Sequence, residues 1–261
     1  MTAALAGKPV TGVGMQMEQV APTARCIMPD LHSFARNLWI ADGPNVRDFG
    51  VVFTTRMTVA KLADGSLWVN SPVPVSFNTL TRITELGPVR CLLAATPRHV
   101  WRLAAWHTLF PEAQLWAPRP TPFTLKKGHL PFTGILGDEP AQAWKDDLGQ
   151  LAFKGNPLIE EVLFFHRQSR TVILDDLIQI HPIVKGKPFR NALLKLGGVA
   201  SPDGGVPLDI RLSFMNRDLA RQSLEKLLSW DFDKLVIAHG VCIEKDAKPF
   251  VERAFRWLLR S

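Results

Sequence analysis

Apolar positions along the chain fall into short β-like runs separated by stretches with helical spacing. A β-hairpin is predicted to turn at Asp64-Gly65, a pair that tolerates the backbone angles of a tight turn. Residues 89–95 form a run that is apolar except for Arg90, which is typical of a strand buried on both faces. Helical spacing of apolar residues precedes and follows that run, at 78–86 and 98–110. The first half is therefore predicted to be a hairpin followed by a β-α-β unit.

The second half of the chain repeats this plan. Strands are predicted within residues 148–174, and Asn216 is placed to cap a helix that runs through residue 229. A short buried strand at 235–238 and a closing helix at 247–259 complete the half. Two half-sheets, each covered by helices on one side, make an α/β fold of four layers, an αββα sandwich.

The domain organisation follows from where periodicity begins. Residues 1–30 show neither helical nor strand spacing and are expected to form an irregular N-terminal leader. No linker-like stretch interrupts the remainder, so residues 31–261 are expected to form a single domain. Within it, residues 177–208 are rich in Gly and Pro and hold one short helical piece.

Composition limits the classes of protein that the chain can belong to. Hydrophobic residues make up 46% and charged residues 21%, as in an ordinary packed domain. The net charge of +7 is compatible with anionic ligands, but the basic residues are scattered and form no nucleic-acid-binding motif. Three cysteines without paired spacing, no N-terminal secretory pattern and no apolar stretch of membrane-spanning length lead us to expect a cytoplasmic protein.

Polar residues follow three of the predicted strands. His99 comes after the run at 89–95, Asp175 and Asp176 directly follow a strand that ends at residue 174, and His239 follows the strand at 235–238. Imidazole nitrogens and carboxylate oxygens are the ligands of a hydrolytic zinc centre, which also needs an open position for water. These residues are therefore candidate metal ligands, whereas hydrogen-bonded or capping roles are the structural alternatives.

The order of these residues, and the elements around them, resemble the metallo-β-lactamase superfamily. Residues 171–177 are similar to the strand that ends in the family's bridging aspartate, and residues 235–240 are similar to the segment with its last ligand histidine. The family motif His-x-His-x-Asp-His corresponds to residues 97–102, where His99 is the one histidine. Asn156 stands where the family often has a histidine, and residues 70–72 stand where it has an Asp-x-Gly turn.

The chain is still more similar to an uncharacterised branch of that superfamily, known as domain of unknown function 4336. The stretches that carry this likeness are residues 53–59, 67–72, 155–161 and 164–166. The resemblance implies the αββα fold with a remodelled, at most mononuclear, metal site. It also implies that residues 177–208 form a lid or insertion over the cleft.

The resemblance implies a metal-dependent hydrolase of an ester, thioester, lactone or phosphoester, if the protein is an enzyme. His99, Asp176 and His239 would hold one ion, and Asp175 or Glu160 would handle protons. Zinc, or else manganese or iron, is the expected ion, and a site without an ion stays open.

The alternative function is that of a non-catalytic member of the fold that binds a small ligand or a protein partner in the same cleft. Binding of nucleic acid through the basic surface is the third and least favoured possibility. We expect a small-molecule substrate or ligand and no membrane partner, and the oligomeric state is open. Arg56 and Arg98 are candidates to hold an anionic group, although surface solvation is the simpler interpretation for each.

Overall fold

Two β-sheets packed face to face make the centre of the molecule, which we describe from a computed structural model. The structure describes residues 30–48, 51–119 and 130–259. The predicted leader, apart from Asp30, lies outside these residues.

The first sheet has seven strands that pair in chain order. They are β1 (His32–Ala35), β2 (Leu38–Asp48), β3 (Val51–Lys61), β4 (Leu67–Asn70), β5 (Val89–Leu93), β6 (Gln114–Ala117) and β7 (Phe132–Ile135). The pairs from β1 to β4 are antiparallel, and those from β4 to β7 are parallel.

The second sheet has four strands in the order β11-β10-β9-β8. They are β8 (Leu148–Phe153), β9 (Glu161–His166), β10 (Thr171–Leu174) and β11 (Lys234–Ile237). Only β10 and β11 are parallel, so their carboxyl ends meet at one edge together with the first residue of β9.

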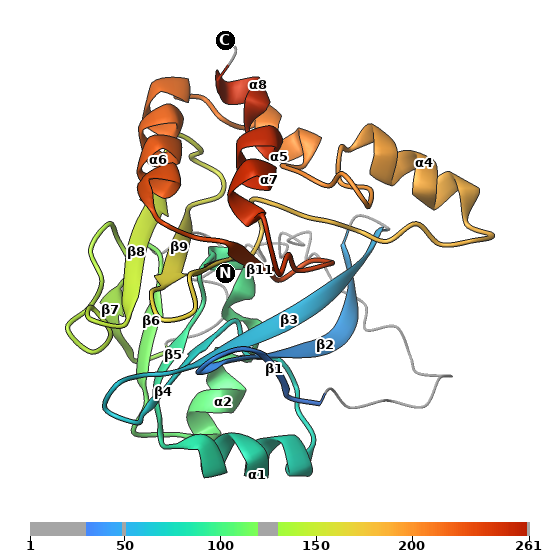
Figure 1. Ribbon diagram of the computed structural model, residues 1–261. Coiled ribbons are helices and arrows are strands. Elements are labelled where there is room, and N and C mark those ends of the chain that lie inside the picture. The colour runs from blue at the N-terminus through green and yellow to red at the C-terminus, as the bar shows by residue number, and fades with distance from the viewer. Residues whose placement is uncertain (1–29, 49–50, 120–129, 260–261) are drawn as a thin grey trace, which may run out of the picture.

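Helices cover the outer faces of both sheets, as Figure 1 shows, and this confirms the predicted four-layer αββα architecture. On the first sheet they are α1 (Phe77–Leu86), the 3-10 helix η1 (Pro97–Arg102) and α2 (Leu103–Leu109). On the second half they are α4 (Pro188–Leu196), α5 (Leu208–Leu212), α6 (Arg217–Ser229), α7 (Ala247–Ala254) and α8 (Arg256–Leu259).

The layer between the two sheets is an apolar core. Trp68 of β4 meets Phe164 of β9 edge to face, with ring centroids 4.8 Å apart, and both side chains are fully buried. An aromatic pair of this geometry stabilises the interface by about 0.5–1.5 kcal/mol beyond the burial of its area. This contact holds the two sheets against each other through β4 and β9.

Several predicted elements differ from the observed ones. The sequence Asp-Gly-Pro-Asn at residues 42–45 predicts a turn. In the structure β2 continues through these residues with a register shift between Gly43 and Val46, so a bulge takes up the irregular sequence. The helix predicted at 98–110 is split into η1 and α2 because the chain starts as a 3-10 turn after Thr96. Asn216 caps α6 as predicted, by accepting a hydrogen bond from the Leu219 amide.

None of the described helices has the length and apolar composition needed to cross a bilayer.

His166, at the end of β9, provides a test of how burial couples stability to pH. Its side chain is 1% exposed, and burial lowers its pKa to about 4 despite the opposing charge of Asp147. The unfolded chain, with an ordinary pKa of about 6.5, therefore binds more protons than the folded chain between these pH values. Stability contributed by the neutral side chain is present above pH 6.5 and is lost as the pH falls toward 4.

We expect the free energy of unfolding of the His166→Asn variant to fall less than that of the parent between pH 7 and pH 4. The difference in that loss should reach about 3 kcal/mol, measured by urea denaturation at each pH. The matched control is His32→Asn, because His32 is exposed on β1. An identical pH slope for the parent and the His166 variant would contradict this account.

Candidate metal centre

The strand ends of both sheets meet at one rim, and the predicted ligands emerge there. Parallel pairing of Leu174 with Ile237 brings the residue pair 175–176 beside His239, two residues beyond β11. The sheets are joined at the same rim, where the Val162 amide donates a 2.9 Å hydrogen bond to the Ala95 carbonyl. The next segment carries His99 in the first turn of η1. Topology thus gathers residues from four separate parts of the chain.

The three predicted metal ligands lie together. The distance between the Nε2 atoms of His99 and His239 is 3.3 Å, and Asp176 Oδ1 lies 3.4 Å from the first and 3.0 Å from the second. Tetrahedral ligands at bond lengths of about 2.0–2.1 Å are separated by roughly 3.3 Å. The spacing of the three atoms therefore fits a single small cation between them.

The tautomer of His239 is fixed by a hydrogen bond at Nδ1, the ring nitrogen that does not face the other two candidate ligands. Its Nδ1 lies 2.6 Å from the Thr54 carbonyl oxygen, which can only accept, so Nδ1 carries a proton and donates it. In a neutral ring, Nε2 then presents a lone pair toward Asp176 Oδ1, which is also an acceptor. Either a second proton on the imidazole or a cation is needed to reconcile two acceptors at this distance.

His99 is oriented in the same way by different partners. Its Nδ1 lies 2.9 Å from Ser71 Oγ and 3.1 Å from Asp175 Oδ2, so the Nδ1 proton is directed to this pair. Its Nε2 is left to face Asp176 and His239. A histidine whose second nitrogen is held by a carboxylate is the usual arrangement behind a metal ligand.

Asp175 supports the ligands rather than joining them. Its carboxylate accepts hydrogen bonds from Asn70 Nδ2 at 3.0 Å and from Ser71 Oγ at 2.5 Å. Asn70 is itself fixed, because its Oδ1 accepts from the Ala95 amide. Ser71 holds its position at a φ of 52°, a backbone region that L-residues rarely adopt. The predicted catalytic role of Asp175 stays a prediction, and its observed contacts are to the back of His99.

Glu161 fixes the loop that carries both aspartates. Its fully buried carboxylate accepts from the amides of Asp175 at 2.5 Å, Asp176 at 3.1 Å and Leu177 at 2.7 Å. Side chains alternate along a strand, which predicts that only one of Glu160 and Glu161 faces inward, and Glu161 is the buried one. Among the residues that the structure describes, Glu160 is half-buried ahead of β9 and makes no hydrogen bond to this cluster, so its catalytic role stays a prediction.

The cluster brings three carboxyl groups and two imidazoles together in a buried place. Burial opposes ionisation of Asp176, yet the charge of His99 and the contact with His239 Nε2 hold the pKa of Asp176 well below its usual value. Burial disfavours the charged form of His99, but Asp176 and Asp175 outweigh it and raise the pKa of His99 well above its ordinary value. Burial, followed by these two negative charges, raises the pKa of Glu161. The site therefore favours positive charge among these groups.

One buried carboxylate oxygen of the cluster has no hydrogen-bond partner among the described residues. This atom is Oδ2 of Asp176. An unpaired carboxylate oxygen in such a place costs free energy unless a cation or water meets it. The ligand spacing involves Oδ1, and a cation that the carboxylate bound through both oxygens would meet Oδ2 as well. Among the described residues, His99, Asp176 and His239 form the one group of candidate metal ligands.

Arg56 is engaged by groups of the protein itself, and its Nε donates to the Asp42 carboxylate at 2.7 Å. Its side chain is 9% exposed, and Nη1 donates to the carbonyls of Ile237 and Gly240 at 2.7 Å and to Cys242 Sγ at 3.0 Å. The guanidinium therefore braces the loop that carries His239. Gly240 is required in that loop because a Cβ there would lie 1.9 Å from the Ile180 carbonyl oxygen.

Asn156, considered as a substitute ligand, is engaged elsewhere. Its side-chain oxygen accepts from the amides of Leu158 and Ile159, and its nitrogen donates to Ser213 Oγ at 2.7 Å. Such a side chain organises a turn and leaves no lone pair directed at the cluster.

Sequence reasoning did not assign Ser71 and His181 to the site. Ser71 was visible as part of the segment at residues 70–72, directly after a buried strand, but its link to His99 depends on spatial contact. His181 is 1% exposed and packs edge to face on Phe53, which also contacts His239. Burial, with lesser effects of His239 and Arg190, lowers the pKa of His181 to about 4. No sequence signal separated it from other loop histidines.

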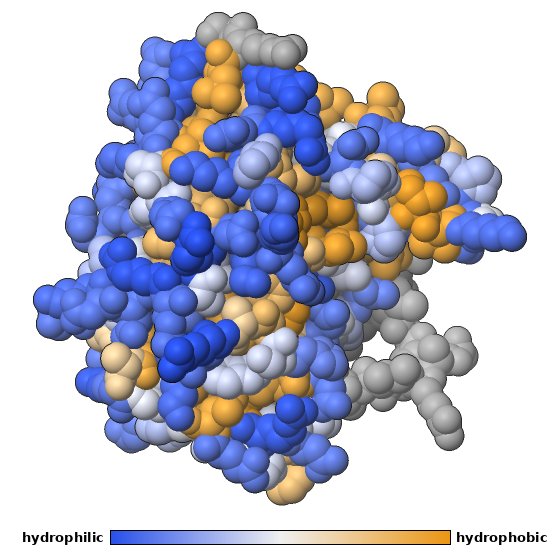
Figure 2. Space-filling view, in the orientation of Figure 1, coloured by the Kyte–Doolittle hydropathy of each residue, from blue (hydrophilic) through white to orange (hydrophobic). Residues whose placement is uncertain are grey.

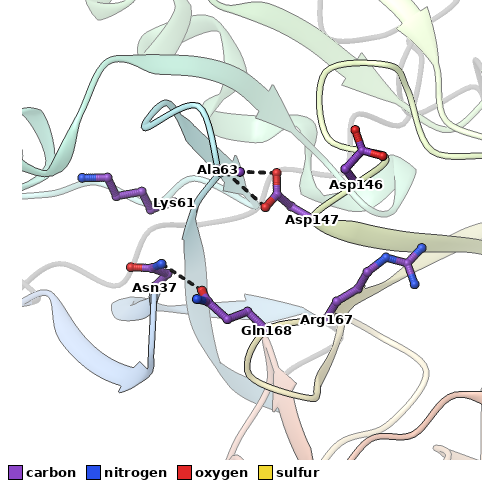
Figure 3. Close-up of a pocket in the computed structure, with 7 residues that line it drawn as sticks. All are labelled: Asn37, Lys61, Ala63, Asp146, Asp147, Arg167 and Gln168. Carbon is purple, nitrogen blue, oxygen red and sulfur yellow. Dashed lines mark hydrogen bonds between the residues drawn. The ribbon is translucent and has the colours of Figure 1, made fainter.

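The side chains of the cluster are nearly enclosed. His99 is 13% exposed, His239 9% and Asp176 5%. A cavity of about 420 Å³, shown in Figure 3, lies instead at the opposite ends of the strands, where Gln168 in the β9–β10 turn bonds Asn37. The figure also shows Asp147 facing the Ala63 amide. This cavity is therefore separate from the candidate metal centre.

The fold is that of the metallo-β-lactamases. A metallo-β-lactamase from Hirschia baltica is 13% identical, with a TM-score of 0.55 over 85% of this chain and 97% of that one. DIM-1 metallo-β-lactamase is 14% identical, with a TM-score of 0.59 over 88% and 97%. The flavodiiron core of Flv1 from Synechocystis sp. PCC6803 is 11% identical, with a TM-score of 0.58 over 89% of this chain and 62% of that one.

At these identities the likeness shows the fold alone. The family described as "Domain of unknown function (DUF4336)" matches residues 37–188, and the chain belongs to this family. No curated protein matches the chain.

The contacts of Glu161 predict a large and local stability effect. In the Glu161→Ala variant three buried backbone amides lose their acceptor, and each such loss costs about 1–3 kcal/mol. We expect a loss of at least about 3 kcal/mol in the free energy of unfolding, measured by urea denaturation with a chelator present. Glu160→Ala is the matched control and should stay within about 0.5 kcal/mol of the parent. Equal effects of the two changes would contradict the assigned contacts.

Proposed function

We propose that the protein is a metal-dependent hydrolase whose single divalent ion is held by His99, Asp176 and His239. The observation that supports this most directly is the mutual spacing of 3.0–3.4 Å among two Nε2 atoms and one carboxylate oxygen. Both Nδ1 protons are already committed to Thr54, Ser71 and Asp175. Two imidazoles whose Nδ1 atoms are held in this way, together with a carboxylate, are preorganised to bind a cation.

Zinc is the first choice of ion, and manganese or iron is the second. Zinc accepts two imidazoles and one carboxylate and, in catalytic sites, leaves a fourth position open. The same two-histidine, one-carboxylate set also suits iron(II). The ligand set limits the protein to one ion, because the family's remaining histidine positions are not matched by histidine here.

The proposed substrates are esters, thioesters, lactones or phosphoesters. When bound, a divalent ion polarises a carbonyl or phosphoryl oxygen and lowers the pKa of water. The protein's own residues orient the site: Ser71 and Asp175 hold the ring of His99, and Thr54 holds that of His239. Asp175, at 3.1 Å from His99 Nδ1, is the proposed proton-handling group, with Glu160 as the other candidate.

A second candidate function is binding of a ligand or partner without catalysis. Its support is the small exposure of the cluster, because His99 at 13% is the most accessible of the three ligand side chains. A substrate would need more access than this to reach the ion. The two functions differ in turnover and not in metal content, so metal analysis and activity must be measured on the same sample.

Metal content tests the proposed ligands directly. The parent protein, purified without chelator, should contain about one equivalent of metal per chain by elemental mass spectrometry. His239→Ala should reduce this to a small fraction, because removal of one of three ligands leaves an incomplete site. His107→Ala is the control, since His107 is half-buried on α2, away from the strand-end cluster. A parent protein without metal, after incubation with zinc, manganese or iron, would overturn the proposal.

Turnover separates the two functions. The loaded parent should hydrolyse at least one of a panel of aryl esters, thioesters, lactones and phosphodiesters, and His239→Ala should lose the activity. Loading to one equivalent without hydrolysis of any member would favour the non-catalytic alternative.

A further inference from the structure

Exposed large apolar side chains gather in one part of the chain. Nine of the sixteen lie between residues 183 and 219, on and around α4 and α5 and in the first turn of α6. They are Ile183, Val184, Phe189, Leu193, Leu196, Leu208, Leu212, Met215 and Leu219. Figure 2 shows hydrophobic side chains on the protruding α4, next to hydrophilic ones. We refer to these nine side chains as the α4–α5 apolar surface.

Helix α4 has two apolar faces, of which only one is used by the fold. Leu194 is buried, whereas Phe189, Leu193 and Leu196 are 77%, 43% and 75% exposed. These three recur at spacings of four and three residues, so they form one stripe on the helix. The stripe points away from the face that Leu194 buries. The amide of Leu208 donates to the Gly197 carbonyl, which places the start of α5 at the end of α4.

The charge on α4 and on the segment before it has one sign, whereas exposed Asp203, Asp209 and Asp218 lie on and beside α5 and at the start of α6. From residue 177 to residue 202 the chain contains no acidic residue, whereas Lys185, Lys187, Arg190 and Lys195 all fall within it. Three of these four side chains belong to exposed residues, and Arg190 is half-buried. A short helix with exposed Phe and Leu, flanked by Lys and Arg, is the pattern of helices that lie at the surface of an anionic bilayer.

From this geometry we propose that the α4–α5 apolar surface binds the surface of membranes that contain anionic lipid. The bilayer fits better than a second copy of the chain, because a twofold contact would bring the same lysines of both copies together. The helix would lie in the interface and would not span the bilayer, in contrast to our sequence-based expectation of no membrane partner.

The proposed membrane contact is independent of the proposed hydrolase activity but lies on the same side of the fold. Ile180, shortly before α4, donates its amide to the His239 carbonyl and accepts from Val241. The segment that carries the apolar surface is thus joined to the metal-centre loop. A hydrolase held in this way would meet amphiphilic substrates at the interface.

Vesicle co-sedimentation of the full chain tests the proposal. The protein should bind vesicles of phosphatidylcholine with about 30% phosphatidylglycerol, and should bind phosphatidylcholine alone at least tenfold more weakly. The double change Phe189→Ser with Leu196→Ser should reduce binding at least tenfold, because both side chains would enter the apolar region. Lys185→Glu with Lys187→Glu should reduce it by a similar factor at low salt.

Phe77→Ser is the matched control. Phe77 is 81% exposed in the first turn of α1, on the other half of the molecule, so its removal should leave vesicle binding unchanged. His239→Ala should also bind vesicles as the parent does, which separates this test from that of the metal centre. Absence of binding to anionic vesicles, or equal loss in Phe77→Ser and Phe189→Ser/Leu196→Ser, would overturn the proposal. Self-association that the latter change abolishes, without vesicle binding, would assign the surface to a second copy instead.

Discussion

The carboxylate of Glu161 is the constraint on which the candidate site depends most. It accepts the amides of three successive residues just after β10 and so sets the direction in which Asp175 and Asp176 leave the sheet. Three N–H donors on one buried carboxylate satisfy groups that would otherwise be unpaired in a dry interior. The two aspartates then contact different partners. Asp175 accepts hydrogen bonds from Asn70 and Ser71, and Asp176 faces the two histidines. Without this fixed loop, the ligand spacing would have no structural basis.

The fold could be predicted from the sequence because most helices and strands show the apolar spacing typical of their type. The run at residues 89–95 and the Asn216-capped helix both appear where their patterns placed them. The prediction was wrong where a bulge or a change in helix type decides the outcome, as in β2 and at η1. The β2 bulge and the 3-10 helix η1 depend on contacts with neighbouring strands, which the local sequence pattern does not specify.

The candidate site was predictable in part for the same reason. His99, Asp176 and His239 each follow a strand, and strand ends of one sandwich meet at one rim. The supporting contacts were not predictable, since Ser71 reaches His99 across 28 positions and Glu161 is distinguished from Glu160 only by burial. His181 lies near the site because it packs on Phe53, and the spacing of residues in the sequence does not reveal such a contact. Ligand types can therefore be found from sequence, whereas the groups that orient them require coordinates.

The central claim is that two imidazoles and one carboxylate hold a single cation at the rim of the sandwich. Anomalous diffraction from crystals grown with zinc tests it most directly. The account predicts one anomalous peak about 2 Å from Nε2 of His99, Nε2 of His239 and a carboxylate oxygen of Asp176. A zinc-containing crystal with no peak among these three side chains, or with the peak on other ligands, would contradict it.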